Sequence, residues 1–221
     1  DNVSIRGNGN ATILKRMFNS SVPEGVITLT GRSGCKIANL QIWGNKTSYT
    51  NSNNYGINLS SSSVNNTITG NTCNSNSYGI YLFASSNNNT ITGNTCYNNS
   101  TGIYLSSSIN NNTITGNTCN NNSYGIYLFA SSDNAVTGNT CNSKSYGIYL
   151  NSSSNNNTIS GNTCNNNSYG INLDASNNNT ITGNTCYNNY STGIYLSSSS
   201  RNTITGNTCN NDPYGIYLDT S

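Results

Sequence analysis

The chain has 221 residues, of which eight are Lys or Arg, six are Asp or Glu and none is His, so its formal net charge is +2. So few basic side chains exclude nucleic acid and anionic lipid as partners, and no apolar run reaches the roughly 20 residues needed for membrane insertion. The lack of His removes the commonest general base and the commonest neutral metal ligand.

The N-terminal stretch is irregular. It carries Met17, Phe18 and four of the eight basic residues. We expect residues 1–35 to form the capping turns of a repeat structure, because solenoids need closed ends. Residues 36–65 are expected to form a first, looser coil, since KIANLQIWGN at 36–45 and YGINL at 55–59 are imperfect copies of later segments.

The rest of the chain is a tandem repeat. The phrase NTITGNTC starts at residues 66, 89, 112, 134, 157, 179 and 202, with small changes at 134 and 157, and GIYL or GINL follows each copy. Successive copies are 22 or 23 residues apart. We therefore assign residues 66–221 to seven regular repeats, the last of them incomplete.

Each repeat contains short runs in which apolar and polar residues alternate, as in Ile80-Tyr81-Leu82. This alternation is typical of strands, and the runs are separated by Gly, Asn and Ser, which form turns. A unit of three short strands cannot bury a face alone, so the repeats are expected to stack. The sequence thus predicts an all-β fold, a single-stranded parallel β-helix (solenoid) with about 22–23 residues and three short strands per coil.

The NTITGN and GIYL phrases resemble the right-handed parallel β-helix repeats of pectin-lyase-like and NosD-like surface proteins. The opening NVSIRGNGNATIL at 2–14 is similar to the first turns of those domains. This resemblance covers essentially the whole chain and implies a right-handed β-helix. It implies little about activity, because many activities share this scaffold.

Alignment of the repeats predicts columns of equivalent residues along the axis. Three columns hold Ile or Val at the NTIT position and the Ile and Leu of GIYL, and they are expected to fill the core. A structural Asn ladder, with amides bonded from coil to coil, is predicted at Asn71, Asn94, Asn117, Asn139, Asn162, Asn184 and Asn207.

The cysteines form another column, with neighbours about 4.8 Å apart along the axis. This structural Cys ladder comprises Cys73, Cys96, Cys119, Cys141, Cys164, Cys186 and Cys209, whereas Cys35 lies outside it and Ile42 takes the column position in its coil. We interpret these residues as small buried apolar side chains. Vertical disulfides and a soft-metal thiolate array are alternatives. With no CxxC pair and no His, we expect no metal site and no cofactor.

No catalytic residue is expected. β-Helix hydrolases resembling this fold use clustered Asp residues and the lyases use Arg or Lys beside an acidic calcium site. Here Asp174 and Asp219 share a column but lie two coils apart, roughly 9.6 Å, at the edge of the range for inverting glycosidases. Lys144 and Arg201 lie three coils apart and cannot act together.

Two outward columns are candidate contact surfaces. A possible glycan-stacking stripe consists of Tyr81, Tyr104, Tyr127, Tyr149, Tyr195 and Tyr217, with a break at Asn172. Such stripes more often stack on themselves and stiffen a sheet. Pairs of the form Thr-x-Thr, such as Thr90 and Thr92, are similar to ice-binding arrays, although Thr is in any case a favoured strand residue.

Our leading interpretation is a non-catalytic structural solenoid, outside the cell or at its surface, in a filament or adhesin. The alternatives are a carbohydrate-binding or pectin-lyase-like carbohydrate-active β-helix, and an ice-binding protein that uses the Thr-x-Thr ladder. Expected partners are surface glycans, and either end-to-end copies of the chain or the continuation of a longer chain. The last repeat would otherwise leave Ile216 and Leu218 uncovered.

Overall fold

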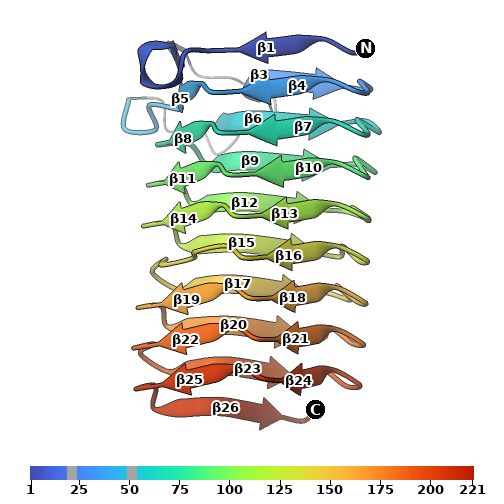
Figure 1. Ribbon diagram of the computed structural model, residues 1–221, viewed down its shortest axis with the longest axis vertical. Coiled ribbons are helices and arrows are strands. Elements are labelled where there is room, and N and C mark those ends of the chain that lie inside the picture. The colour runs from blue at the N-terminus through green and yellow to red at the C-terminus, as the bar shows by residue number, and fades with distance from the viewer. Residues whose placement is uncertain (19–23, 49–53) are drawn as a thin grey trace.

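The structure is a computed structural model that describes residues 1–18, 24–48 and 54–221. All of its paired strands are parallel and stack along one long axis, which confirms the predicted parallel β-solenoid (Figure 1). The one helix in the described part of the chain is the three-residue turn η1 (Gly9–Ala11). No described segment is therefore a helix long and apolar enough to span a bilayer.

Most coils place one short strand on each of three faces. Face A consists of β1 (Ser4–Arg6), β4 (Lys36–Ala38), β7 (Thr67–Thr69), β10 (Thr90–Thr92), β13 (Thr113–Thr115), β16 (Ala135–Thr137), β18 (Thr158–Ser160), β21 (Thr180–Thr182) and β24 (Thr203–Thr205). Face B consists of β2 (Ile13–Lys15), β5 (Gln41–Trp43), β8 (Thr72–Asn74), β11 (Thr95–Tyr97) and β14 (Thr118–Asn120), then β19 (Thr163–Asn165), β22 (Thr185–Tyr187) and β25 (Thr208–Asn210). Face C consists of β3 (Glu24–Thr30), β6 (Asn54–Ser60), β9 (Tyr78–Phe83), β12 (Thr101–Ser106), β15 (Tyr124–Phe129), β17 (Tyr146–Asn151), β20 (Tyr169–Asp174), β23 (Thr192–Ser197) and β26 (Tyr214–Asp219).

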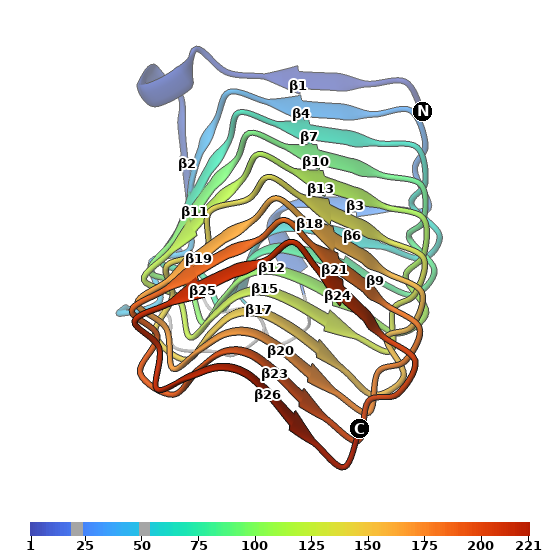
Figure 2. The ribbon, with the colours of Figure 1, turned by 60° about the horizontal axis from the view of Figure 1, so that its bottom comes forward.

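Equivalent residues of successive coils pair one to one. On face A, for example, Ile91 pairs with Ile68 on one side and with Ile114 on the other. Coils of 22 and 23 residues keep the same register because the difference falls in a turn. Viewed obliquely toward the C-terminal end, the coils overlay as similar bent loops (Figure 2).

The core is a continuous apolar column along the axis. The Ile and Leu residues of the three predicted columns are completely buried in the central coils, as at Ile114, Ile126 and Leu128. At the C-terminal end the same columns are open, and Ile216 and Leu218 are 50% and 58% exposed. Stacking therefore buries each coil with its neighbours, as the repeat pattern predicts.

Residues 1–35 include one coil of their own. Their strands β1, β2 and β3 pair with β4, β5 and β6 of the next coil. Arg16 is buried in this part, where its guanidinium lies 3.8 Å from the Glu24 carboxylate and donates to the Glu24 carbonyl.

Buried asparagines link the coils at three turns rather than at the single turn predicted from the sequence. The predicted ladder is present: Asn94 donates from its backbone N–H and from Nδ2 to Oδ1 of Asn117, and Nδ2 also donates to the Ile68 carbonyl. A second ladder comprises Asn66, Asn89, Asn112, Asn134, Asn157, Asn179 and Asn202. A third runs in two parts, Asn76 to Asn99 to Asn122 and then Ser143 to Asn167 to Asn189 to Asp212, with Ser143 in place of an asparagine where the two parts meet. These amides satisfy backbone groups that turns would otherwise leave unpaired.

Candidate functional site

The structure places the seven predicted cysteines at equivalent positions of successive coils along face B. Cys96 pairs with Cys73 and Cys119. Ile42 pairs with Cys73 and takes the same position in the coil before it. All eight cysteines of the chain are free thiols. Contact with neighbouring thiols and burial raise the pKa of Cys73 and of Cys141, which keeps both protonated at neutral pH.

Thiol reactivity tests this arrangement. Cys209 is only partly buried, whereas the other seven cysteines are buried. In the native protein, we expect a thiol reagent such as DTNB to label Cys209 first and the others only after unfolding. Without reductant, denaturant should expose eight reactive thiols. In the native protein, a Cys209→Ser variant should lose the fast phase of the DTNB reaction. A count below eight would show disulfides instead.

Asp212 ends the third ladder with a carboxylate where the other coils have an amide or a hydroxyl. Its Oδ1 accepts from the backbone N–H of Asn189 at 2.6 Å and from Nδ2 of Asn189 at 3.0 Å. Its Oδ2 is buried and has no hydrogen-bond partner among the described residues. Burial accordingly raises the pKa of Asp212.

Replacing Asp212 with Asn should stabilise the protein by about 1 kcal/mol at pH 7. The new Nδ2 could donate to a carbonyl, as Asn122 Nδ2 donates to the Cys96 carbonyl. The folded state favours protonated Asp212, so the gain should shrink as the pH falls through the raised pKa. Unfolding curves at several pH values measure this, with the exposed Asp133→Asn variant as control. An equal gain at all pH values would contradict it.

The tyrosine stripe lies on face C in the predicted register, with Asn172 between Tyr149 and Tyr195. Its rings stack on each other: Tyr104 and Tyr127 have centroids 4.8 Å apart at 17°, and Tyr127 and Tyr149 are 4.9 Å apart at 21°. A second tyrosine column, which was not predicted from the sequence, interleaves with the first. Ring faces along most of the stripe are thus covered by neighbouring rings.

The stack is interrupted at Asn172. A hollow of about 180 Å³ opens there, between Tyr149 and Tyr195 and beside Asp174. Burial and the nearby Asp174 carboxylate raise the pKa of Tyr149. Tyr169 of the second column also lines this hollow, and its ring centroid lies 5.5 Å from that of Tyr195, so aromatic contacts continue past Asn172.

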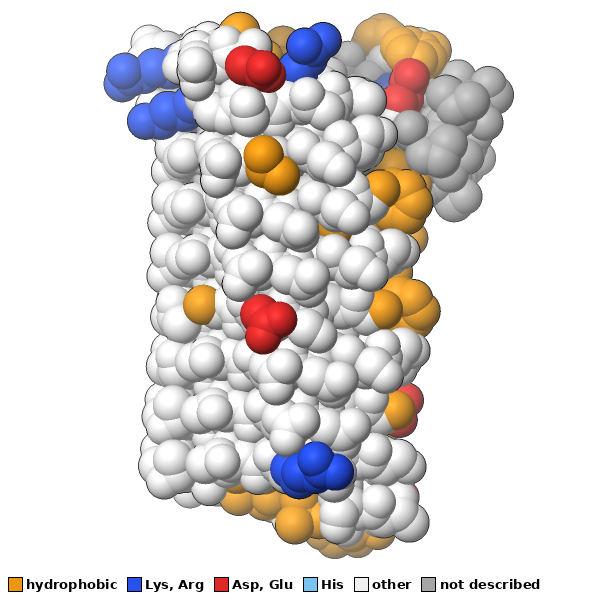
Figure 3. All heavy atoms as spheres, turned by 90° about the vertical axis from the view of Figure 1, so that its right-hand side faces the viewer, with side chains coloured by type: hydrophobic (Ala, Val, Ile, Leu, Met, Phe, Trp, Pro, Cys, Tyr) orange, Lys and Arg blue, Asp and Glu red, His pale blue; other side chains and the backbone are white. Residues whose placement is uncertain are grey.

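The remaining predicted candidates are dispersed. Asp174 and Asp219 share a column with Ser197 between them, and each accepts from a tyrosine hydroxyl: Tyr149 to Asp174 at 3.4 Å and Tyr195 to Asp219 at 3.1 Å. Charged side chains are few and scattered over the face shown in Figure 3. The structure does not bring the two carboxylates together.

The threonine columns run along face A in register and are interrupted, as the sequence indicates. Ala135 pairs with Thr113 and Thr158, and Ser160 pairs with Thr137 and Thr182. The array is therefore not a continuous Thr-x-Thr surface.

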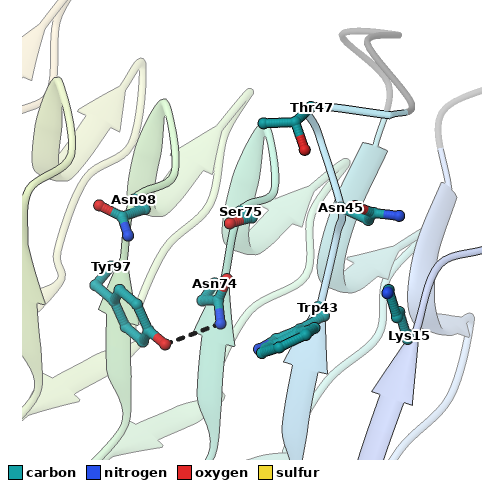
Figure 4. Close-up of a pocket in the computed structure, with 8 residues that line it drawn as sticks. All are labelled: Lys15, Trp43, Asn45, Thr47, Asn74, Ser75, Tyr97 and Asn98. Atoms are coloured by element: carbon teal, nitrogen blue, oxygen red, sulfur yellow. Dashed lines mark hydrogen bonds between the residues drawn. The ribbon is translucent and has the colours of Figure 1, made fainter.

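A further site lies on face B and was not predicted from the sequence. Trp43, Asn74 and Tyr97 occupy one column, so two aromatic rings flank an asparagine (Figure 4). They line a hollow of about 290 Å³ together with Lys15, whose Nζ lies 5.6 Å from the Trp43 ring centroid. Alignment of the residue that follows each cysteine, and of the residue that follows Ile42 in the earlier coil, would have placed Trp43, Asn74 and Tyr97 in one column.

Comparison with known families identifies the chain by sequence. The profile of the family described as "Periplasmic copper-binding protein (NosD)" matches residues 1–112 and again residues 98–221. The chain belongs to the NosD family. Sequence comparison with curated proteins finds no relative of this NosD-family chain.

Solved structures similar to the NosD-family chain are β-helices. The periplasmic alginate epimerase AlgG has a TM-score of 0.62 at 19% identity, over 91% of this chain and 64% of AlgG. The mannuronan C-5 epimerase AlgE4 A-module of Azotobacter vinelandii has a TM-score of 0.60 at 16% identity, over 99% of this chain and 83% of the module. Pectate lyase Pel9A has a TM-score of 0.65 at 14% identity, over 99% of this chain and 68% of the lyase. At these identities the likeness shows the fold alone. The chain spans about half to two thirds of the length of the AlgG structures.

The family description names copper, but the residues of this NosD-family chain do not fit a copper site. The chain has no His. In the described ranges, no group of three His, Cys, Asp or Glu residues is arranged to hold a metal ion. The cysteines are the softest ligands available, and six of the eight (Cys73, Cys96, Cys119, Cys141, Cys164 and Cys186) are completely buried in the core, away from an entering ion. No step proposed below involves copper.

Proposed function

We propose that the chain is a non-catalytic, extracytoplasmic structural β-solenoid, a rigid segment of a cell-surface, filament or adhesin protein. The observation that carries this proposal is the separation of Asp174 and Asp219, each of which is bonded to a tyrosine. General acid–base chemistry on a glycan needs two such groups around one bond. The periplasmic description of the family and of AlgG supports a location outside the cytoplasm.

The internal bonding also suits a scaffold. The central coils are linked to their neighbours by strand pairing, by amide ladders and by stacked tyrosines, as between Asn94 and Asn117 and between Tyr104 and Tyr127. Buried polar networks whose groups are hydrogen-bonded from coil to coil hold a structure in one conformation. A solenoid built in this way holds its length and shape, which is what a structural segment requires.

The test is turnover. The protein is incubated with uronic-acid and neutral polysaccharides, and reducing ends and unsaturated products are measured, with a pectate lyase on polygalacturonate as positive control. We expect no product. Turnover that disappears in Asp174→Asn or Asp219→Asn would contradict the proposal.

A second candidate function is carbohydrate binding on face C, and the hollow at Asn172 favours it. Tyr149, Tyr169 and Tyr195 line this hollow around Asn172, where the tyrosine stripe has a gap, so a sugar ring has aromatic side chains to pack against. Asp174 lines the same hollow and can accept from sugar hydroxyls.

A glycan array with variants tests this candidate. Tyr149→Ala and Tyr195→Ala should remove binding, whereas Tyr104→Ala, within the continuous stack, should keep it. A blank array, or equal binding by all variants, would reject a face C glycan site.

A further inference from the structure

The hollow on face B combines aromatic rings with polar donors. Trp43 is 37% exposed, and Asn74 Nδ2 donates to the Tyr97 hydroxyl at 2.9 Å, which fixes the Tyr97 side chain on the opposite side of Asn74 from Trp43. Trp43 and Tyr97 are two coils apart, roughly 9.6 Å. Sugar rings pack their C–H faces on such aromatic surfaces, and amides and hydroxyls bind their hydroxyl groups.

The polar rim of this hollow is basic. Lys15 lies over the Trp43 ring, and the other lining residues are neutral: Asn45, Thr47, Ser75 and Asn98 beside the aromatic pair and Asn74. None of the lining residues is acidic. The hollow therefore favours a sugar that carries a negative charge.

A second hollow of about 270 Å³ adjoins the first, and Asn98 lines both. Lys46 and Lys144 line it with Asn and Ser residues, and no acidic residue is among the lining residues. Burial and the charge of Lys144 lower the pKa of Lys46, so the two ammonium groups act on each other. An anion bound between them would relieve this repulsion.

We propose that the two hollows form one binding track for an acidic polysaccharide. A pyranose ring sits between Trp43 and Tyr97, and carboxylates or sulfates of the same chain pair with Lys15, Lys46 and Lys144. An acidic glycan carries its charges about one sugar apart, so three separated lysines match it better than the backbone of duplex DNA, which carries one charge per about 1.7 Å of helix axis. This track is separate from the hollow on face C, and the proposal goes beyond a purely structural role.

Calorimetry with the whole chain, Asp1–Ser221, tests the track. The probes are an oligogalacturonate, a sulfated oligosaccharide and a neutral oligosaccharide of equal length. We expect binding of one or both acidic probes, weakened by salt, and none of the neutral probe. Trp43→Ala should weaken binding about three- to tenfold, and Lys46→Gln with Lys144→Gln about tenfold at low salt.

Matched surface variants are the controls. Tyr187→Ala changes an exposed aromatic residue of face B, and Lys36→Gln changes an exposed lysine of face A. Both should bind like the parent, and Trp43→Phe should retain most of the affinity. Failure to bind either acidic probe, or equal binding of the neutral probe, would overturn the proposal. So would losses of affinity in the control variants as large as those in the track variants. Binding of single-stranded DNA that equals glycan binding and is unaffected by Trp43→Ala would also overturn it. These binding results are independent of the turnover test.

Discussion

Replacing Asn117 with Ala should lower the free energy of unfolding by about 3–6 kcal/mol. The Asn117 side chain is 1% exposed and joins three coils. Its Oδ1 accepts from the N–H and Nδ2 of Asn94, and its Nδ2 donates to the Ile91 carbonyl and to Oδ1 of Asn139. Alanine leaves several of these buried groups without a partner, and each costs about 1–3 kcal/mol.

Chemical denaturation followed by far-UV circular dichroism measures the effect. Asn210→Ala is the control, because Asn210 is an exposed asparagine of β25 and its loss should cost less than about 0.5 kcal/mol. A loss below about 1 kcal/mol for Asn117→Ala would show that the ladder contributes little to stability.

Gly102→Ala should destabilise the protein by about 3 kcal/mol, since a methyl group there has no space. A Cβ at Gly102 would lie 2.6 Å from the Gly125 carbonyl oxygen and 3.2 Å from Cys119 Cβ, both in the next coil. Backbone cannot move away at one coil without disturbing the pairing of the next, so the steric cost spreads along the stack.

A second glycine provides the comparison. Gly116 has a φ of +62°, and no atom would lie within 4 Å of a Cβ at this position, so Gly116→Ala should cost only about 1 kcal/mol through backbone strain. Thermal and denaturant unfolding of both variants should give the larger loss for Gly102→Ala. The reverse order would mean that coils can separate enough to accommodate a side chain.

The fold was predictable because the alternation in NTIT and GIYL and the 22–23-residue spacing place the same residue types at the same position of every coil. The core columns and the Asn117 ladder follow directly from that alignment, and the structure has them. The second and third ladders were missed because the chain has 50 Asn residues, and periodicity alone does not distinguish a buried amide from an exposed one. That distinction needs the turn geometry.

The candidate binding surfaces on faces B and C were less predictable than the fold, for a physical reason. The tyrosine stripe could be read from the sequence, but whether its rings face solvent or each other depends on side-chain rotamers, and Tyr104 and Tyr127 are stacked. The face B track depends on Trp43 in the loosest coil and on Lys46 and Lys144, which lie almost 100 residues apart in sequence and line one hollow. The sequence pattern does not connect them.

One proton NMR experiment tests most directly the central claim that the solenoid holds an acidic glycan without changing it. A defined oligogalacturonate is mixed with the chain and followed for several days. We expect broadened glycan signals, which sharpen again with the Lys46→Gln, Lys144→Gln variant, and signal areas that stay constant. New signals from unsaturated, shortened or C-5-inverted sugars, or sharp signals with the unmodified chain, would contradict it.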